Sequence, residues 1–171
     1  MSLSRPRTVN DLLNYRLSCL LASSGAMTTR LCEGRYGITR REWRLIVLLA
    51  AHGAMSPSQL ASRAHLERAR TSRHITELVQ RGLLQGRTHL DDRRRAEVEL
   101  TPAGRAIYEE LFPQSVGFHK QVLAVLSAQE RAAFESALAK LTDNAERIAA
   151  SQPVPEKADR RHGGARRLRP R

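Results

Sequence analysis

The chain has 171 residues, of which 41% are hydrophobic and 27% charged, so it can bury a core as one compact domain or as one domain plus a tail. Its 29 Lys and Arg residues against 17 Asp and Glu give a net charge of +12, and 26 of the 29 cations are Arg. Because the guanidinium fork suits phosphate groups and guanine edges, this excess predicts a nucleic-acid partner. Aromatic residues make up only 4%, which argues against a single-strand binder that stacks bases on aromatic rings.

Several other classes of protein are excluded by what the sequence lacks. No run of about 18 apolar residues is present, and the polar start of the chain has no signal-peptide segment, so we expect a cytoplasmic protein. Two cysteines, Cys19 and Cys32, are too few for a disulfide framework or a zinc cluster. No phosphate-binding glycine loop, zinc-protease motif or nucleophile elbow occurs, so we expect no metal, no cofactor, no catalytic residue and no enzyme.

The first half of the chain has the apolar spacing of helices. Helix-capping patterns begin at Thr39 and Ser56, where a Glu or Gln follows three residues later, and Gly37, Gly53 and Gly82 stand where helices end. The spacing predicts one long helix from Val9 to about Glu33, then helices at 39–51, 56–64 and 67–81.

The pattern then changes to period two. Residues 84–88 and 96–100 alternate like strands around the charged tip Asp91–Arg95, which predicts a β-hairpin. Further helices are expected at 102–112 and 115–150, with their joints near Pro113 and Ser127. This order predicts a mainly α fold with a small hairpin wing, the winged helix-turn-helix.

Four segments follow from this pattern. They are an N-terminal helical segment at 1–36, a winged helix-turn-helix lobe at 37–112, C-terminal helices at 113–150 and a disordered basic tail at 151–171. The apolar residues of the first and last helices exceed what one small lobe can cover, which favours an intertwined homodimer.

The helix at 67–81 has the composition of a recognition helix, since small and polar residues let its backbone approach the major groove and Arg can pair with guanine or phosphate. An ordinary surface helix with solvated arginines is the alternative. At the hairpin tip, consecutive arginines repel one another unless an anion such as phosphate lies nearby. The residues expected to contact DNA are Ser56, Arg68, Arg70, Thr71, Ser72, Arg73, His74, Asp92, Arg93, Arg94 and Arg95.

Several segments together resemble the MarR (multiple antibiotic resistance regulator) family of bacterial transcription factors over roughly residues 10–150. They are Ile38–Arg44, Ser58–Ala61, Arg70–Leu84, Asp92–Arg94 and Leu100–Gly104. The resemblance implies a homodimeric regulator, more commonly a repressor, that reads a pseudo-palindromic operator in double-stranded DNA. In such a regulator the helices at 1–36 and 113–150 form the dimerisation region, and the lobe at 37–112 binds DNA. It also implies that Thr71, Ser72 and Arg73 face the major groove, and that Arg94, supported by Asp92, enters the minor groove.

The resemblance further implies release from DNA by a small aromatic or phenolic acid, or by thiol oxidation. The residues expected to line an effector pocket are Tyr15, Arg16, Cys19, Trp43 and Arg44. The alternative for this set is that Trp43 fills the core and Arg16 forms an ion pair. A regulator oxidised at Cys19, and a non-specific basic protein that binds any nucleic acid, remain alternatives to a ligand-responsive repressor.

Overall fold

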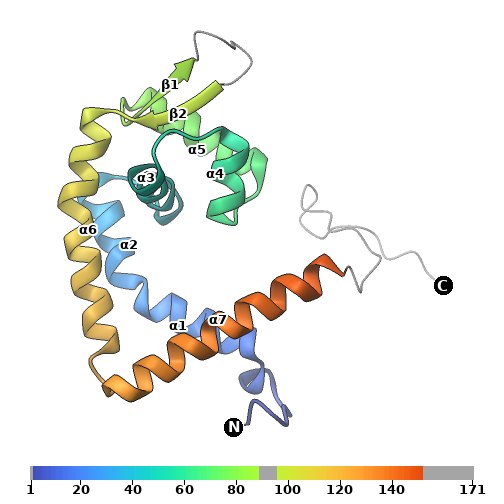
Figure 1. Cartoon of the computed structure of the whole chain (residues 1–171). Helices are drawn as coiled ribbons and strands as arrows, with labels where there is room; N and C mark the ends of the chain where they lie inside the picture. Colours follow the sequence, from blue (N-terminus) through green and yellow to red (C-terminus); the bar gives the residue numbers. More distant parts are fainter. Residues whose placement is uncertain (1, 89–95, 152–171) are drawn as a thin grey trace, which may run out of the picture. The chain divides into compact units, whose positions relative to one another are not determined.

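The computed structural model describes residues 2–88 and 96–151, and divides the chain into two compact units, Met1–Ala124 and Val125–Arg171. The described chain is mainly helical with one antiparallel hairpin, which confirms the predicted fold class (Figure 1). No helix in the described part is long and apolar enough to cross a membrane.

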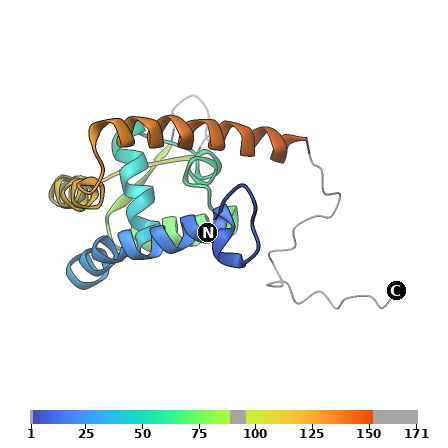
Figure 2. The ribbon, with the colours of Figure 1, turned by 90° about the horizontal axis from the view of Figure 1, so that it is seen from below.

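The predicted long first helix is wrong, because the chain forms three shorter pieces there. A 3₁₀ turn, η1 (Val9–Asp11), precedes α1 (Leu13–Ser24), and α2 (Ala26–Tyr36) follows after a change of direction at Gly25 (Figure 2). Gly25 is buried, and a Cβ atom there would overlap the guanidinium group of Arg40. The break therefore lets a side chain from α3 (Arg40–His52) pack directly on the backbone of Gly25.

Three helices and the hairpin form the central lobe of the first unit: α3 (Arg40–His52), α4 (Pro57–Ala64), α5 (Arg68–Gln80), β1 (Leu84–Thr88) and β2 (Ala96–Leu100). The predicted capping boxes at Thr39 and Ser56 are present. Gly37, Gly53 and Gly82 have positive φ angles of 62°, 78° and 68°, a conformation that favours glycine. Local sequence signals thus set these helix ends.

The core lies where α3, α4 and α5 meet the hairpin and α6 (Pro102–Leu123). Its residues are apolar and at most 7% exposed, and their burial away from water is the main stabilising term of this unit. The largest apolar side chains among those that are fully buried are Ile38, Leu45, Ile46, Leu49, Leu60, Leu78, Leu84 and Leu111.

The hairpin is anchored to the lobe on its β2 side. Leu84 pairs with Leu100 and Gly86 with Val98, and Val98 exchanges two backbone hydrogen bonds with Met55, at 2.9 and 3.1 Å. Because Met55 lies between α3 and α4, the hairpin extends from a fixed point on the helix-turn-helix.

Helix α6 (Pro102–Leu123) continues through Pro113, where a joint was expected. Proline lacks an N–H and so leaves a carbonyl of the preceding turn without its helical donor. The Gln114 side chain donates to Glu110 O at 3.0 Å and the Ser115 hydroxyl to Leu111 O at 3.1 Å, which supplies polar contacts in this turn. The expected boundary between residues 112 and 113 therefore falls inside one continuous helix.

The second unit contains α7 (Ala128–Ala150), which begins at the capping box of Ser127 and Glu130. Hydrogen bonds from the Ser127 backbone N–H and hydroxyl lower the pKa of the Glu130 carboxyl. Phe134, Leu138 and Leu141 share one face of this helix, and each is more than 40% exposed.

Gly104 provides a test of how α6 packs against the chain just before β1. Residue 104 is buried in the first turn of α6, and a Cβ atom there would overlap the carbonyl oxygen of Leu83. We predict that Gly104→Ala lowers the free energy of unfolding by about 1–3 kcal/mol, because the contact involves backbone that cannot turn aside. Gly117→Ala, in the same helix with nothing within 4 Å, should be neutral or stabilising by up to about 1 kcal/mol. Thermal and urea unfolding measure both, and equal effects of the two substitutions would contradict this packing.

Candidate nucleic-acid interface

One side of α5 is buried in the core. Thr71, Ile75 and Leu78 follow helical spacing and are 0%, 7% and 0% exposed. The Thr71 hydroxyl donates to Glu67 O at 3.0 Å inside the same helix. The expectation that Thr71 faces DNA is therefore wrong, because it belongs to the stripe that fixes α5 to the lobe.

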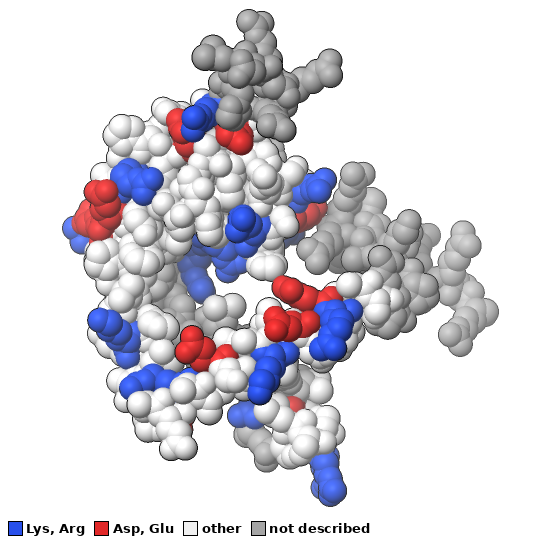
Figure 3. All heavy atoms as spheres, in the orientation of Figure 1, with Lys and Arg blue, Asp and Glu red and all other residues white. Residues whose placement is uncertain are grey.

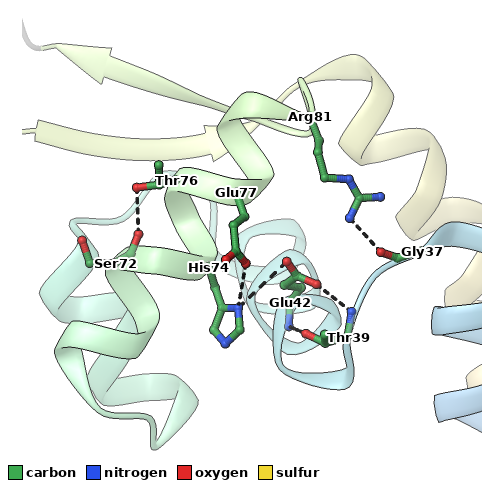
Figure 4. A network of polar contacts seen from close by, with 8 residues as sticks. All are labelled: Gly37, Thr39, Glu42, Ser72, His74, Thr76, Glu77 and Arg81. Carbon is green, nitrogen blue, oxygen red and sulfur yellow. Dashed lines mark hydrogen bonds and ion pairs between the residues drawn. The ribbon is translucent and has the colours of Figure 1, made fainter. Parts of the chain in front are cut away.

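His74 also points inward rather than toward solvent. Its Nδ1 atom lies 3.9 Å from Glu42 Oε1 and 3.4 Å from Glu77 Oε2, and its side chain is only 18% exposed. The other oxygen of Glu42 accepts from the Thr39 N–H at 2.6 Å, so this cluster ties α5 to the first turn of α3 (Figure 4). His74 is thus partly buried in this cluster, and its expected contact with DNA stays a prediction.

The same cluster is the group of residues in the described part of the chain whose side chains lie close enough together to hold a metal ion. Glu42, His74 and Glu77 offer three ligand atoms within 4.8 Å of one another. The three side chains lie between α3 and α5, and the buried Nδ1 atom of His74 has no hydrogen-bond partner among the described residues.

The opposite side of α5 is exposed. Arg68, Arg70, Ser72 and Arg73 all reach solvent, as expected of a recognition helix. Thr76, which the sequence analysis missed, is exposed one turn after Ser72 and donates its hydroxyl to Ser72 O at 3.1 Å. Figure 4 shows Ser72 and Thr76 on the side of α5 away from Glu42. The helical spacing of the buried residues Thr71, Ile75 and Leu78 places Thr76 on the exposed side, so this spacing would have identified it.

The exposed arginines differ in how they are paired. Arg70 contacts Glu67 at 3.5 Å, a surface ion pair that contributes little to stability. No carboxylate within residues 2–88 and 96–151 forms an ion pair with Arg68 or Arg73. Their positive charges are therefore open to an external anion, and the helix surface around them consists of small and polar residues.

Of the other residues expected to contact DNA, Ser56 caps α4. Its hydroxyl donates to Gln59 Oε1 at 2.9 Å and accepts from the Gln59 N–H at 3.3 Å. Asp92, Arg93, Arg94 and Arg95 lie outside the described residues.

A cavity of about 340 Å³ lies beside the first turn of α3, in the first unit. It is lined by Leu21, Thr29, Glu33, Thr39, Arg40, Arg41 and Arg44. Figure 3 shows Lys and Arg side chains gathered below α3 and α4. Three arginines against one glutamate give this cavity a positive character.

The residues expected to line an effector pocket are not all brought together there. Arg44 lines this cavity, whereas its neighbour Trp43 is 7% exposed and stacks on Tyr108 with ring centroids 6.2 Å apart. Tyr15, Arg16 and Cys19 are exposed on α1 and are not among the lining residues. Arg40 and Arg41, which the sequence analysis did not single out as pocket residues, take their place.

Comparison with known proteins agrees with this architecture. The model of the MarR family matches residues 38–96, from the turn before α3 to the start of β2. The HTH-type transcriptional regulator YdgJ of Bacillus subtilis is 31% identical over 118 residues, which cover 69% of this chain and 72% of that protein. The chain belongs to the MarR family.

Two further proteins that are similar to this chain are informative. The homoprotocatechuate degradative operon repressor of Escherichia coli is 27% identical over 96 residues, covering 56% of this chain and 65% of that protein. The crystal structure of NadR in complex with 4-hydroxyphenylacetate has a TM-score of 0.66 and 25% identity, covering 80% of this chain and 96% of that chain. The protein is thus a transcriptional regulator with the winged helix fold, in a family of regulators rather than enzymes.

The two cysteines of this MarR-family chain differ in environment. Cys32 is fully buried, and burial raises the pKa of its thiol to about 11 against the opposing positive charge of Arg40. Since the thiolate is the reactive form, Cys32 is unsuited to sensing oxidants at neutral pH. Cys19 is exposed on α1.

Thiol reactivity should separate these two sites. We predict that Ellman's reagent modifies one thiol per folded chain at pH 7.5, and the second thiol only in denaturant. The Cys32 thiol is covered by the folded chain, and it is also protonated at pH 7.5 because burial raises its pKa to about 11. In Cys19→Ser no thiol should react rapidly, whereas Cys32→Ser should keep the fast reaction. Rapid modification of folded Cys19→Ser at pH 7.5 would show that Cys32 is accessible and reactive.

Proposed function

We propose that this MarR-family regulator is a homodimeric repressor that binds a pseudo-palindromic operator and is released by a small aromatic acid. The observation that supports DNA reading best is the two-sided character of α5. One side is fixed in the core by Thr71, Ile75 and Leu78, and the other presents Ser72, Arg73 and Thr76 to solvent.

These exposed residues suit the major groove. The Arg73 fork can pair with guanine O6 and N7, while the hydroxyls of Ser72 and Thr76 can donate to bases or phosphates. Arg68 and Arg70 lie nearer the start of the helix, where phosphate contacts position it. The wing arginine Arg94, supported by Asp92, is proposed on the family pattern alone to reach the minor groove.

The exposed apolar residues favour a dimer. Large apolar side chains in the N-terminal pieces and toward the C-terminal end are 39–85% exposed, an amount that points to an association surface. They are Val9, Leu12, Tyr15, Leu20, Leu21, Met27, Val122, Val125, Phe134, Leu138, Leu141 and Ile148. We propose that these surfaces pair about a twofold axis, as the family resemblance implies.

An aromatic acid is proposed as the effector on two grounds. NadR, which shares the fold, is solved with 4-hydroxyphenylacetate, and a repressor of a homoprotocatechuate degradative operon is among the relatives. This chain has a cavity with three arginines whose guanidinium groups suit a carboxylate.

Selection from a random pool of duplex DNA tests the proposal. The full chain should enrich an inverted repeat with half-site centres about 10 base pairs apart, because twofold-related recognition helices enter successive major grooves on one face of the duplex. Affinity for the selected site should fall steeply with salt as counterions are released. Enrichment of no sequence, with the same salt dependence on every duplex, would support the non-specific basic protein instead.

Two variants on α7 connect operator binding to the dimer. Leu138→Asp places a charge on the apolar face and should give monomers by sedimentation and weaken operator binding at least tenfold. Ser136→Asp adds the same charge on the other side of α7 and should leave mass and affinity unchanged. A dimeric Leu138→Asp variant, or monomers that bind the full site with wild-type affinity, would contradict the proposed assembly.

A further inference from the structure

The carboxylate of Glu42 is buried beside a second carboxylate, with one imidazole between them. Its side chain is 5% exposed, and one oxygen accepts from the Thr39 N–H at 2.6 Å, while Oε1 faces His74 Nδ1 at 3.9 Å. No Lys or Arg in the described part of the chain forms an ion pair with Glu42 or Glu77. A buried carboxylate requires a compensating positive charge, and one imidazole supplies at most one such charge for the two carboxylates.

The Nδ1 atom of His74 points toward both carboxylates (Figure 4). It is buried and has no hydrogen-bond partner among the described residues, although Glu77 Oε2 lies only 3.4 Å away. That contact is therefore not aligned as a hydrogen bond. Since a neutral imidazole nitrogen is the commonest metal ligand among side chains, a metal ion is the partner that this nitrogen and the two carboxylates share best.

The three donor groups have separations close to those of a small coordination site. Ligand atoms about 2.0–2.2 Å from a tetrahedral zinc ion lie about 3.3–3.6 Å from one another. The 3.4 Å between His74 Nδ1 and Glu77 Oε2 falls in this range, and the 3.9 Å to Glu42 Oε1 exceeds it by a few tenths of an ångström. Because Glu77 is 56% exposed, its side chain is free to make the small adjustment that closes the site.

The mixed donor set favours Zn²⁺ over the common hard cations. An imidazole suits Zn²⁺, whereas Mg²⁺ prefers six oxygen ligands in octahedral geometry. Three protein ligands leave the fourth tetrahedral position to water, and the exposed Glu77 gives the ion a path from solvent. These features suit a site that loads and unloads reversibly. Its ligands come from two helices far apart in the sequence, so no short motif signals it.

We propose that Glu42, His74 and Glu77 form a reversible Zn²⁺ site that fastens the recognition helix α5 to the first turn of α3. Glu77 directly follows Thr76 and lies one turn after Arg73, on the helix proposed to read DNA. A free carboxylate at this position repels phosphate, and coordination neutralises it, so Zn²⁺ strengthens operator binding. The metal site stands on the geometry alone, whereas the effect on operator binding rests on the proposed function.

Zinc binding by the full chain, without an added histidine tag, tests the site. In competition with a chromophoric Zn²⁺ indicator, wild type should bind zinc and Mg²⁺ should not displace it. His74→Gln and Glu77→Gln should each weaken zinc binding at least tenfold, because each removes one of three protein ligands. Zinc should also raise the melting temperature of wild type but not of Glu77→Gln, which stays folded because residue 77 is exposed.

Two matched variants control for the loss of an imidazole or a carboxylate. His52→Gln removes an exposed imidazole at the end of α3, and Glu109→Gln removes an exposed carboxylate from α6. Both should bind zinc as tightly as wild type. Absence of zinc binding by wild type, or wild-type affinity in both His74→Gln and Glu77→Gln, would overturn the site.

Operator binding in Zn²⁺ and in a chelator tests the coupling to α5. Zinc should strengthen wild-type operator binding at least threefold. Glu77→Gln should bind the operator in chelator at least as tightly as metal-free wild type, because the repelling charge is gone, and it should not respond to zinc. A zinc effect of the same size in wild type and Glu77→Gln would overturn the coupling.

The outcomes separate this inference from the proposed function. A chain that binds zinc through His74 and Glu77 yet keeps the same operator affinity would overturn the coupling and leave the metal site in place. A chain that selects an operator but binds no zinc would overturn this inference and leave the proposed function intact. A chain that binds zinc at this site but selects no operator would overturn the proposed function alone.

Discussion

The burial of one side of α5 is the constraint on which the rest of the structure depends. Thr71, Ile75 and Leu78 are held in the core, so the helix cannot rotate without exposing apolar surface to water. That fixed orientation decides which residues are presented to solvent, and it is the reason that Arg73 and Thr76 form an outer face while His74 faces Glu42. The reading surface is thus a consequence of core packing.

The first turn of α3 joins the separate parts of the first unit. Thr39 and Glu42 form its cap, and Glu42 also faces His74 of α5. Arg81, just after α5, donates to Gly37 O and Tyr36 O at 2.9 and 2.8 Å, which ties the same helix to the end of α2. With Arg40 packed on Gly25 and Arg44 bound to α4, a few residues of α3 contact most of the elements that position the recognition helix.

Features encoded locally could be predicted from the sequence, and features that depend on distant contacts could not. The caps at Thr39 and Ser56 and both strands follow from short-range patterns, and each lies where it was expected. Helix α7 likewise begins at Ser127, where a joint was expected. The break at Gly25 leaves room for the guanidinium group of Arg40, fifteen positions away along the chain, and no local pattern signals that contact. Proline at position 113 favours a joint by local rules, yet α6 continues through it. The inward positions of Thr71 and His74 were accessible in principle, since their helical spacing matches Ile75 and Leu78, but composition alone favoured a DNA role.

Protection of position 76 by DNA tests the central claim most directly. In a Cys19→Ser background, a Thr76→Cys variant places one reactive thiol on the outer face of α5, and Glu109→Cys places one on α6 as a reference. If α5 lies in the major groove, saturating operator duplex should slow alkylation at position 76 at least tenfold and leave position 109 unchanged. Equal alkylation rates at position 76 with and without bound operator would contradict the account.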